Sequence, residues 1–109
     1  MAADAPFPYQ DSSRSTEERV SDLLFRMTLE EKAGLLFHNM IVPGSDGSLF
    51  GPVPELGILD TTELLEDKHM SRFNLVGPIT DPRLVAIWHN RIQQHVLDYT
   101  RLGIPVTLS

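Results

Sequence analysis

The segment from Val20 to His38, VSDLLFRMTLEEKAGLLFH, most strongly limits what this chain can fold into. Its first half repeats apolar residues at i, i+3, i+4 and i+7, a spacing that places them on one side of an α-helix. This pattern predicts an amphipathic helix that ends near Met27. The residues that form the stripe are Val20, Leu23, Leu24 and Met27.

The second half of the segment predicts a capped turn followed by a strand. Thr28 precedes Glu31 by three residues, the spacing of a capping box that starts a new helical turn. Leu35, Leu36 and Phe37 form an apolar run too short for a helix, which favours a strand buried on both faces. A helix that leads directly into a buried strand is typical of a barrel or a doubly wound sheet.

Two polar residues, His38 and Asn39, come directly after this predicted strand. In parallel α/β sheets and barrels, the residues just past the carboxyl end of a strand line the binding site. His38 and Asn39 are therefore candidates for hydrogen bonding to a polyhydroxylated ligand. The alternative is that they satisfy backbone groups of the neighbouring Gly/Pro loop, residues 43–48.

Acidic residues in the segment do not predict a catalytic pair. Glu30 and Glu31 are adjacent in sequence, and adjacent residues of a helix do not face each other, so they cannot act together from two sides of one substrate bond. We expect both, with Lys32, to be solvated. His89 and His95 are six residues apart on a predicted helix and lie on different faces, so they form no metal pair.

Residues 1–14 predict an extended or disordered N-terminal arm, because they are rich in Pro and Ala without a period. Residues 15–109 contain the predicted helices and strands and are assigned to one truncated domain. Ser15 with Glu18 predicts a capping box at the start of the first helix. Residues 43–70 predict an irregular lid or rim containing a short helix that begins near Asp60, and residues 73–76 predict a second strand.

The longest predicted helix covers residues 82–101. It starts at Asp81 as N-cap and Pro82 as first helical residue, and Gly103 is its predicted C-terminal cap. Trp88 lies on its apolar stripe and is expected to pack in the core. Gln93 and Gln94 are expected either to bond to a neighbouring loop or to face solvent. Residues 104–108 predict a third strand.

Four sequence blocks, which include the capped turn, resemble the β-glucosidase-like enzymes of glycoside hydrolase family 3, in that family's order and with its spacing. They are RMTLEEKAG at 26–34, RFNLVG at 72–77, WHNRIQQ at 88–94 and TRLGIPVTLS at 100–109. The resemblance implies an α/β fold, namely a partial (β/α)8 TIM-type barrel. This chain would be the N-terminal portion only, truncated at residue 109. A complete barrel needs about 200 residues or more, so we expect a fragment of a larger enzyme.

The resemblance also implies the chemistry of a retaining, exo-acting β-glycosidase. In such enzymes one carboxylate attacks the anomeric carbon and a second carboxyl acts as acid and then as base. The corresponding acidic positions would fall beyond Ser109, so no catalytic residue is assigned here and the isolated chain is expected to be inactive. The implied partners are a β-linked glucoside or xyloside and the remainder of its own barrel and following domain, with no metal or organic cofactor.

The amino-acid composition argues against several other classes of protein and site. The net charge of −6 gives no electrostatic reason to expect a nucleic acid, and the absence of cysteine excludes disulfides and thiolate metal sites. No apolar run approaches the length of a membrane span, and no signal peptide is visible. The expected location is therefore the cytoplasm if Met1 is the native start.

Two rival functions are weighed from the sequence. One is a small helical interaction module that docks the apolar faces of residues 16–27 and 82–101 on a partner. The other is a carbohydrate-binding fragment without hydrolysis, which would need aromatic platforms, whereas the single Trp is assigned to a helix core. The tail GIPVTL, residues 103–108, favours a barrel strand over a helical module.

Overall fold

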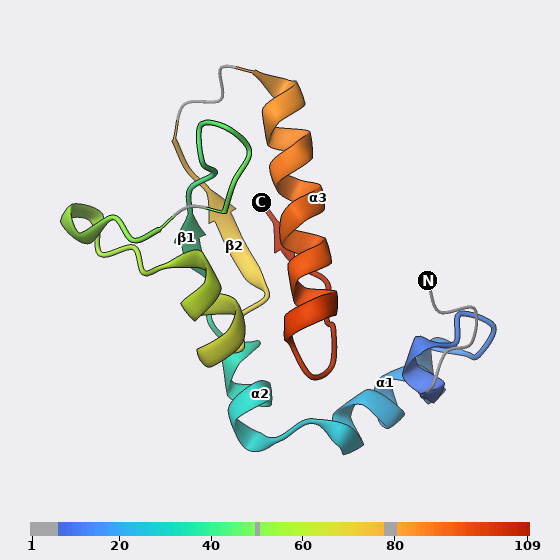
Figure 1. The fold of residues 1–109 in the computed structure, drawn as a ribbon. Coiled ribbons are helices and arrows are strands. Elements are labelled where there is room, and N and C mark those ends of the chain that lie inside the picture. The colour runs from blue at the N-terminus through green and yellow to red at the C-terminus, as the bar shows by residue number, and fades with distance from the viewer. Residues whose placement is uncertain (1–6, 50, 78–80) are drawn as a thin grey trace.

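The structure, a computed structural model, describes residues 7–49, 51–77 and 81–109, and within them it is a small α/β domain (Figure 1). The elements in chain order are η1 (Pro8–Gln10), α1 (Thr16–Arg26), α2 (Leu29–Gly34), β1 (Asn39–Ile41), η2 (Pro54–Leu56), η3 (Glu63–Asp67), β2 (Arg72–Leu75), α3 (Pro82–Tyr99) and β3 (Thr107–Leu108). No helix in these ranges is both long and apolar enough to cross a membrane.

The three strands form one parallel sheet in the order β1-β2-β3. Asn39 of β1 pairs with Phe73 of β2, and Phe73 pairs with Leu108 of β3. Parallel neighbours need crossover connections, which here run through η3 and through α3. The prediction of an α/β fold with parallel strands is therefore confirmed.

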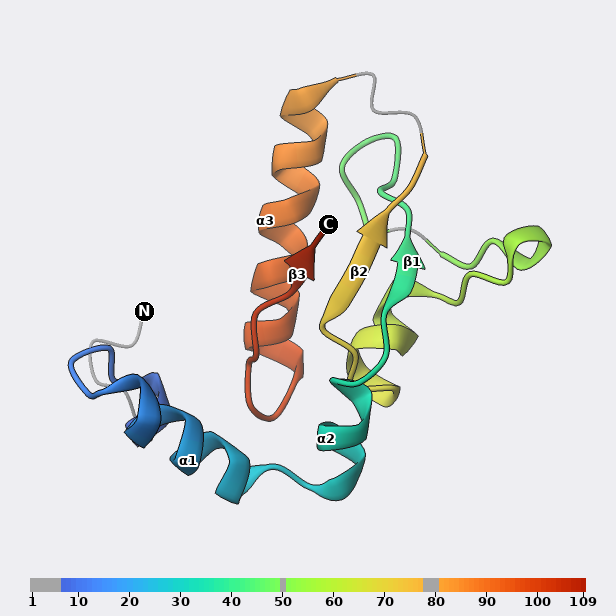
Figure 2. The same cartoon turned by 180° about the vertical axis from the view of Figure 1, so that it is seen from behind.

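In the part of the chain that the structure describes, the helices that cover the sheet lie on one of its faces. Trp88, Ile92 and Val96 of α3 are buried in one cluster with Ile41 and Phe73 of the strands. Figures 1 and 2 show α3 and η3 on the same side of the strands, with α1 extending away from the sheet. The predicted packing role of Trp88 is confirmed, since its exposed fraction is 0%.

The predicted helix starts are confirmed by their caps. Ser15 Oγ accepts the backbone N–H of Glu18 at the start of α1. The carboxylate of Asp81, the residue before Pro82, accepts the backbone N–H of Arg83 at the start of α3. Thr28 and Glu31 form the complete reciprocal capping box predicted for α2. These side chains satisfy donors that a helix N-terminus leaves without an intrahelical partner.

The predicted end of α3 is wrong by two residues. The helix ends at Tyr99, and Thr100 is the C-cap, with its N–H bonded to the carbonyl of Val96. Gly103 instead has φ of 61°, a left-handed conformation that suits glycine and turns the chain back toward β3. The third strand is accordingly shorter than the predicted 104–108, and the second begins at Arg72, one residue early.

The prediction of a buried strand at Leu35–Phe37 is wrong. Their backbone N–H groups bond back to carbonyls of α2, so these residues complete its last turn. Leu36 and Phe37 are 85% and 59% exposed. The strand begins only at Asn39, because the helical hydrogen bonds continue through the residues that the apolar run marked as a strand.

The predicted lid over residues 43–70 is wrong for its second half. Leu64 and Leu65 of η3 are fully buried with the face of α3 that covers the sheet. Residues 61–67 thus belong to the crossover between β1 and β2. The short helix itself and the turn at Asp60, whose carboxylate accepts the N–H of Thr62, agree with the prediction.

Residues 7–14 of the predicted N-terminal arm pack on α1, whereas residues 1–6 lie outside the described residues. The N–H of Tyr9 donates to the carboxylate of Asp22, and its hydroxyl donates to the carbonyl of Leu102 at 2.8 Å. The guanidinium of Arg26 lies 4.1 Å from the ring centroid of Phe7. Polar and cation–π contacts therefore attach this segment to the body.

Gly34 allows α2 to pass close to the turn before β2. A Cβ at Gly34 would lie 2.4 Å from the carbonyl oxygen of His69 and 2.6 Å from that of Lys68. Both obstacles are backbone atoms, and His69 is held at φ of 55°, so the turn has little freedom to move. Only glycine fits at this position.

We predict that Gly34→Ala lowers the free energy of unfolding of this chain by about 1–3 kcal/mol, the usual cost of overpacking. The gain in helix propensity offsets less than this. Gly51→Ala is the matched control, because a Cβ there meets nothing within 4 Å. Urea denaturation followed by circular dichroism measures both variants, and equal stabilities would contradict the close approach.

Candidate functional site

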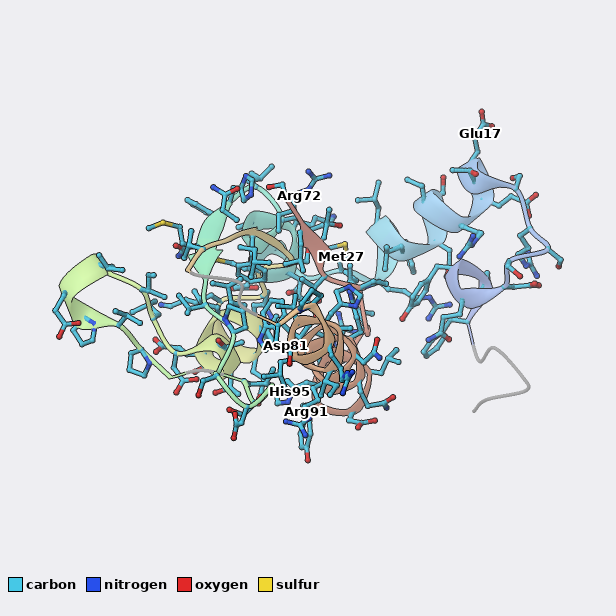
Figure 3. All side chains as sticks on the ribbon, turned by 90° about the horizontal axis from the view of Figure 1, so that it is seen from above. Glu17, Met27, Arg72, Asp81, Arg91 and His95 are labelled. Atoms are coloured by element: carbon cyan, nitrogen blue, oxygen red, sulfur yellow. The ribbon has the colours of Figure 1, made fainter. Side chains whose placement is uncertain are left out.

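The face of the sheet opposite α3 is open and mostly polar. Strand alternation places one set of side chains on it, all of them exposed. Figure 3 shows Arg72 on the far side of the strands from His95 and Arg91 of α3. The residues of this open face are His38, Met40, Arg72, Asn74, Thr107 and Ser109.

Ser109 connects the polar groups of the three strands. Its hydroxyl donates to Oδ1 of Asn74 at 2.8 Å and lies 3.3 Å from Nε2 of His38. The direction of the contact with His38 depends on the tautomer of the imidazole. The amide and the imidazole both lie within hydrogen-bond reach of the hydroxyl, and the three groups offer both donors and acceptors, so the cluster is suited to binding hydroxyl groups.

The two predicted site residues do not lie where the sequence argument put them. His38 precedes β1 and Asn39 begins it, so both are at the amino end of the strand and not past its carboxyl end. Asn39 has the strand parity of Ile41, on the helix-covered face, and its Oδ1 accepts the N–H of Met40 at 2.7 Å. Only His38 belongs to the open face, and its role in binding stays a prediction.

The other residues of the open face were missed by the sequence analysis. The sequence patterns predicted no binding role for Arg72, Asn74, Thr107 or Ser109. The signal was present as alternation: in RFNL and in VTLS polar and apolar residues alternate, the period of a half-buried strand.

No carboxylate belongs to the open face in the described ranges of the chain, so this face holds neither half of a glycosidase acid pair. The prediction that Glu31 is solvated is wrong. Its exposed fraction is 9%, it accepts the N–H of Thr28, and it forms an ion pair with Arg101. Glu30 is exposed, as expected.

The environment of Glu31 favours its charged form. Burial acts to raise its pKa, but hydrogen bonds from Arg101 and Thr28 outweigh it, so the pKa lies below the ordinary 4.5. Arg101 also donates to the carbonyl of Arg26 at 2.8 Å. The pair therefore attaches the start of α2 to the segment after α3, a structural role.

The histidines of α3 are engaged separately. Nε2 of His95 lies 2.7 Å from the carboxylate of Glu66, and its ring stacks on Tyr99. Nε2 of His89 lies 3.2 Å from the side-chain amide of Gln93. Within the part of the chain that the structure describes, no three His, Asp or Glu residues are grouped to hold a metal ion.

We predict that Glu31→Gln, which retains the acceptor of the capping box, destabilises the chain by about 1 kcal/mol at neutral pH, a value kept small because Arg101 is half exposed. A carboxyl whose pKa is depressed on folding stabilises above its unfolded pKa and loses this effect as pH falls through the folded pKa. The difference from the unsubstituted chain should therefore shrink below pH 4.5. Glu30→Gln is the matched control, and a pH-independent difference in urea titrations would contradict the ion pair.

Comparison with known proteins gives relatives over nearly the whole chain, although no protein-family model matches it. A probable β-glucosidase C of Aspergillus flavus is 44% identical over 106 residues, which cover 93% of this chain and 16% of the relative. The β-glucosidase C of Emericella nidulans is 44% identical over 102 residues, covering 93% of this chain and 15% of the relative.

A bacterial protein shares the similarity at a lower level. The periplasmic β-glucosidase/β-xylosidase of Dickeya chrysanthemi is 33% identical over 102 residues, covering 94% of this chain and 15% of the relative. The chain thus spans about one sixth of the length of these relatives or slightly less. The resemblance found in the sequence blocks is confirmed: this chain is homologous to one segment of the β-glucosidases.

Proposed function

We propose that this chain forms the first strands of the (β/α)8 barrel of a retaining, exo-acting β-glycosidase that acts on β-linked glucosides or xylosides. The observation that carries the proposal is the 44% identity to proteins named β-glucosidase over 93% of the chain. The one-sided sheet supports it, since a barrel covers its strands with helices only on the outside.

The open face would be the inner wall of that barrel. Its polar groups, His38, Arg72, Asn74 and Ser109, offer donors and acceptors of the kind that orient a sugar, while Phe73 and Ile41 face the outer helices. The nucleophile and the acid/base would come from the rest of the enzyme. The residues of the open face would then shape the pocket and bind the sugar rather than cleave it.

The helical interaction module remains a second candidate because of α1. No residue of this helix is buried, and Val20, Leu24 and Phe25 are 49%, 47% and 89% exposed. The parallel sheet argues against that function, because β3 pairs with β2 and has no purpose in a helical adaptor. In the barrel proposal the exposed side chains of α1 pack against the rest of the enzyme.

We predict that the 109-residue chain does not hydrolyse nitrophenyl β-glucoside, whereas a longer protein that continues past Ser109 does. The reason is that retaining hydrolysis needs two carboxyl groups about 5–5.5 Å apart, and the open face holds none. Release of nitrophenol measures both proteins, with the xyloside as a second substrate. Activity of the short chain, or none in the longer protein on either substrate, would contradict the proposal.

A second prediction separates the two candidate site residues. In the longer protein, His38→Ala should lower kcat/KM by about tenfold. Although His38 lies at the amino end of β1, its Nε2 is 3.3 Å from the hydroxyl of Ser109, just past the carboxyl end of β3, so a hydrogen bond is lost at the edge where a barrel binds its substrate. Asn39→Ala should have a much smaller effect, because that residue has the parity of the outer face. Steady-state kinetics of both variants decides this, and equal effects, or a larger effect at Asn39, would assign the binding role differently.

A further inference from the structure

The side-chain amide of Gln93 binds the backbone of the residue that precedes β3. The N–H of Val106 donates to Oε1 of Gln93 at 2.9 Å, and Nε2 of Gln93 donates to the carbonyl of Val106 at 2.8 Å. Both hydrogen-bonding groups of one residue are thus satisfied by one side chain from α3. An adjacent strand would satisfy such groups in the same way.

The direction of these bonds identifies which edge of β3 is occupied. The N–H of Thr107 donates to the carbonyl of Ser71, and that of Ser109 donates to the carbonyl of Phe73, so both point toward β2. Successive residues of a strand direct their backbone groups to opposite sides. The groups of Val106 and Leu108 therefore point away from β2, to the outer edge of the sheet.

Gln93 therefore occupies the outward-facing backbone groups of Val106 and leaves those of Leu108 available. β3 is the edge strand of the sheet in the described residues, and its next outward-facing groups are those of Leu108. An unpaired edge accepts another strand wherever N–H and C=O groups are available. At Val106 they are already taken, so pairing can begin only at Leu108.

A groove lies beside this edge, at the amino end of β3. Its volume is about 360 Å³, and Leu97, which lines it, is 62% exposed. The groove lies between α3 and the segment that leads into β3. Its lining residues are His89, Gln93, Val96, Leu97, Gly103 and Pro105.

We propose that Gln93 is a positioning residue that caps the outer edge of β3 at Val106, so that the next parallel strand pairs with β3 from Leu108 onward. The occupant is a further strand of the same protein, and this part rests on the proposed function. The length of the relatives supports it, since about five sixths of each lies outside the aligned segment. Gln93 touches no reacting group and acts only through β3.

The cap is tested first in this chain by amide hydrogen exchange and NMR. The Val106 amide should be protected, and the side-chain amide of Gln93 should exchange more slowly than that of Gln94. Gln94 is the matched control, because it is exposed and bonds Asp98, one turn along the helix. An unprotected Val106, or equal exchange of the two glutamine side chains, would overturn the proposal.

Substitution then tests whether Gln93 is the cause of the protection of the Val106 amide. Gln93→Met, which keeps the length but loses both hydrogen bonds, should speed exchange of Val106 by about tenfold, while Gln94→Met leaves it unchanged. Exchange of the Val96 amide within α3 reports whether the helix stays folded. If Gln93→Met unfolds α3, Gln93→Glu is measured in its place. Exchange of the Val106 amide should then speed up by less than the tenfold expected for Gln93→Met, because the carboxylate still accepts the N–H of Val106.

The register is tested in the longer protein, where the Leu108 amide should become protected. Val106 should still lose its protection in Gln93→Met there. Protection of Val106 that no longer depends on Gln93 would mean that the next strand covers it, which overturns the register. None of these readouts needs sugar hydrolysis, so an inactive longer protein would defeat the proposed function and leave the cap at Val106 standing.

Discussion

The packing of α3 on one face of the three strands is the contact on which the remaining structure depends. Trp88, Ile92 and Val96 cover Ile41 and Phe73, and each of these side chains is nearly or fully removed from water. Burial of large apolar side chains contributes about 1.5–3 kcal/mol each, so this layer outweighs the surface ion pairs. Because it covers only one face, the residues of opposite parity are left polar and open.

Much of this layer could be predicted from the sequence because its signals are local. The packing of Trp88 on the stripe of α3, the start of this helix at Asp81 and Pro82, and the capping box of α2 need only neighbouring residues, and all are confirmed. The last residue of the predicted stripe, Tyr99, is instead 66% exposed. The parallel arrangement is expected for strands separated by a helix. The finer expectation of a barrel derives from the family resemblance, and the local patterns carry no information about it.

The wrong predictions concern residues whose environment is set by distant partners. Leu35–Phe37 are apolar, but hydrogen bonds from α2 hold them in a helical end, and apolar content alone cannot distinguish a short strand from such an end. Glu31 has two charged neighbours, a pattern typical of a solvated turn. Its partner Arg101 is far along the chain, so no local pattern indicated the pair.

The same reasoning explains why Gln93 and Gln94 could not be separated by sequence. They are adjacent and chemically identical, and on a helix adjacent residues point about 100° apart. One reaches the backbone of Val106, whereas the other lies on the exposed side with Asp98. The amide nearest the sheet therefore acts as part of the strand layer, although it belongs to a helix. In a sheet whose third strand has only two residues, one such side chain determines where the hydrogen-bonded edge begins.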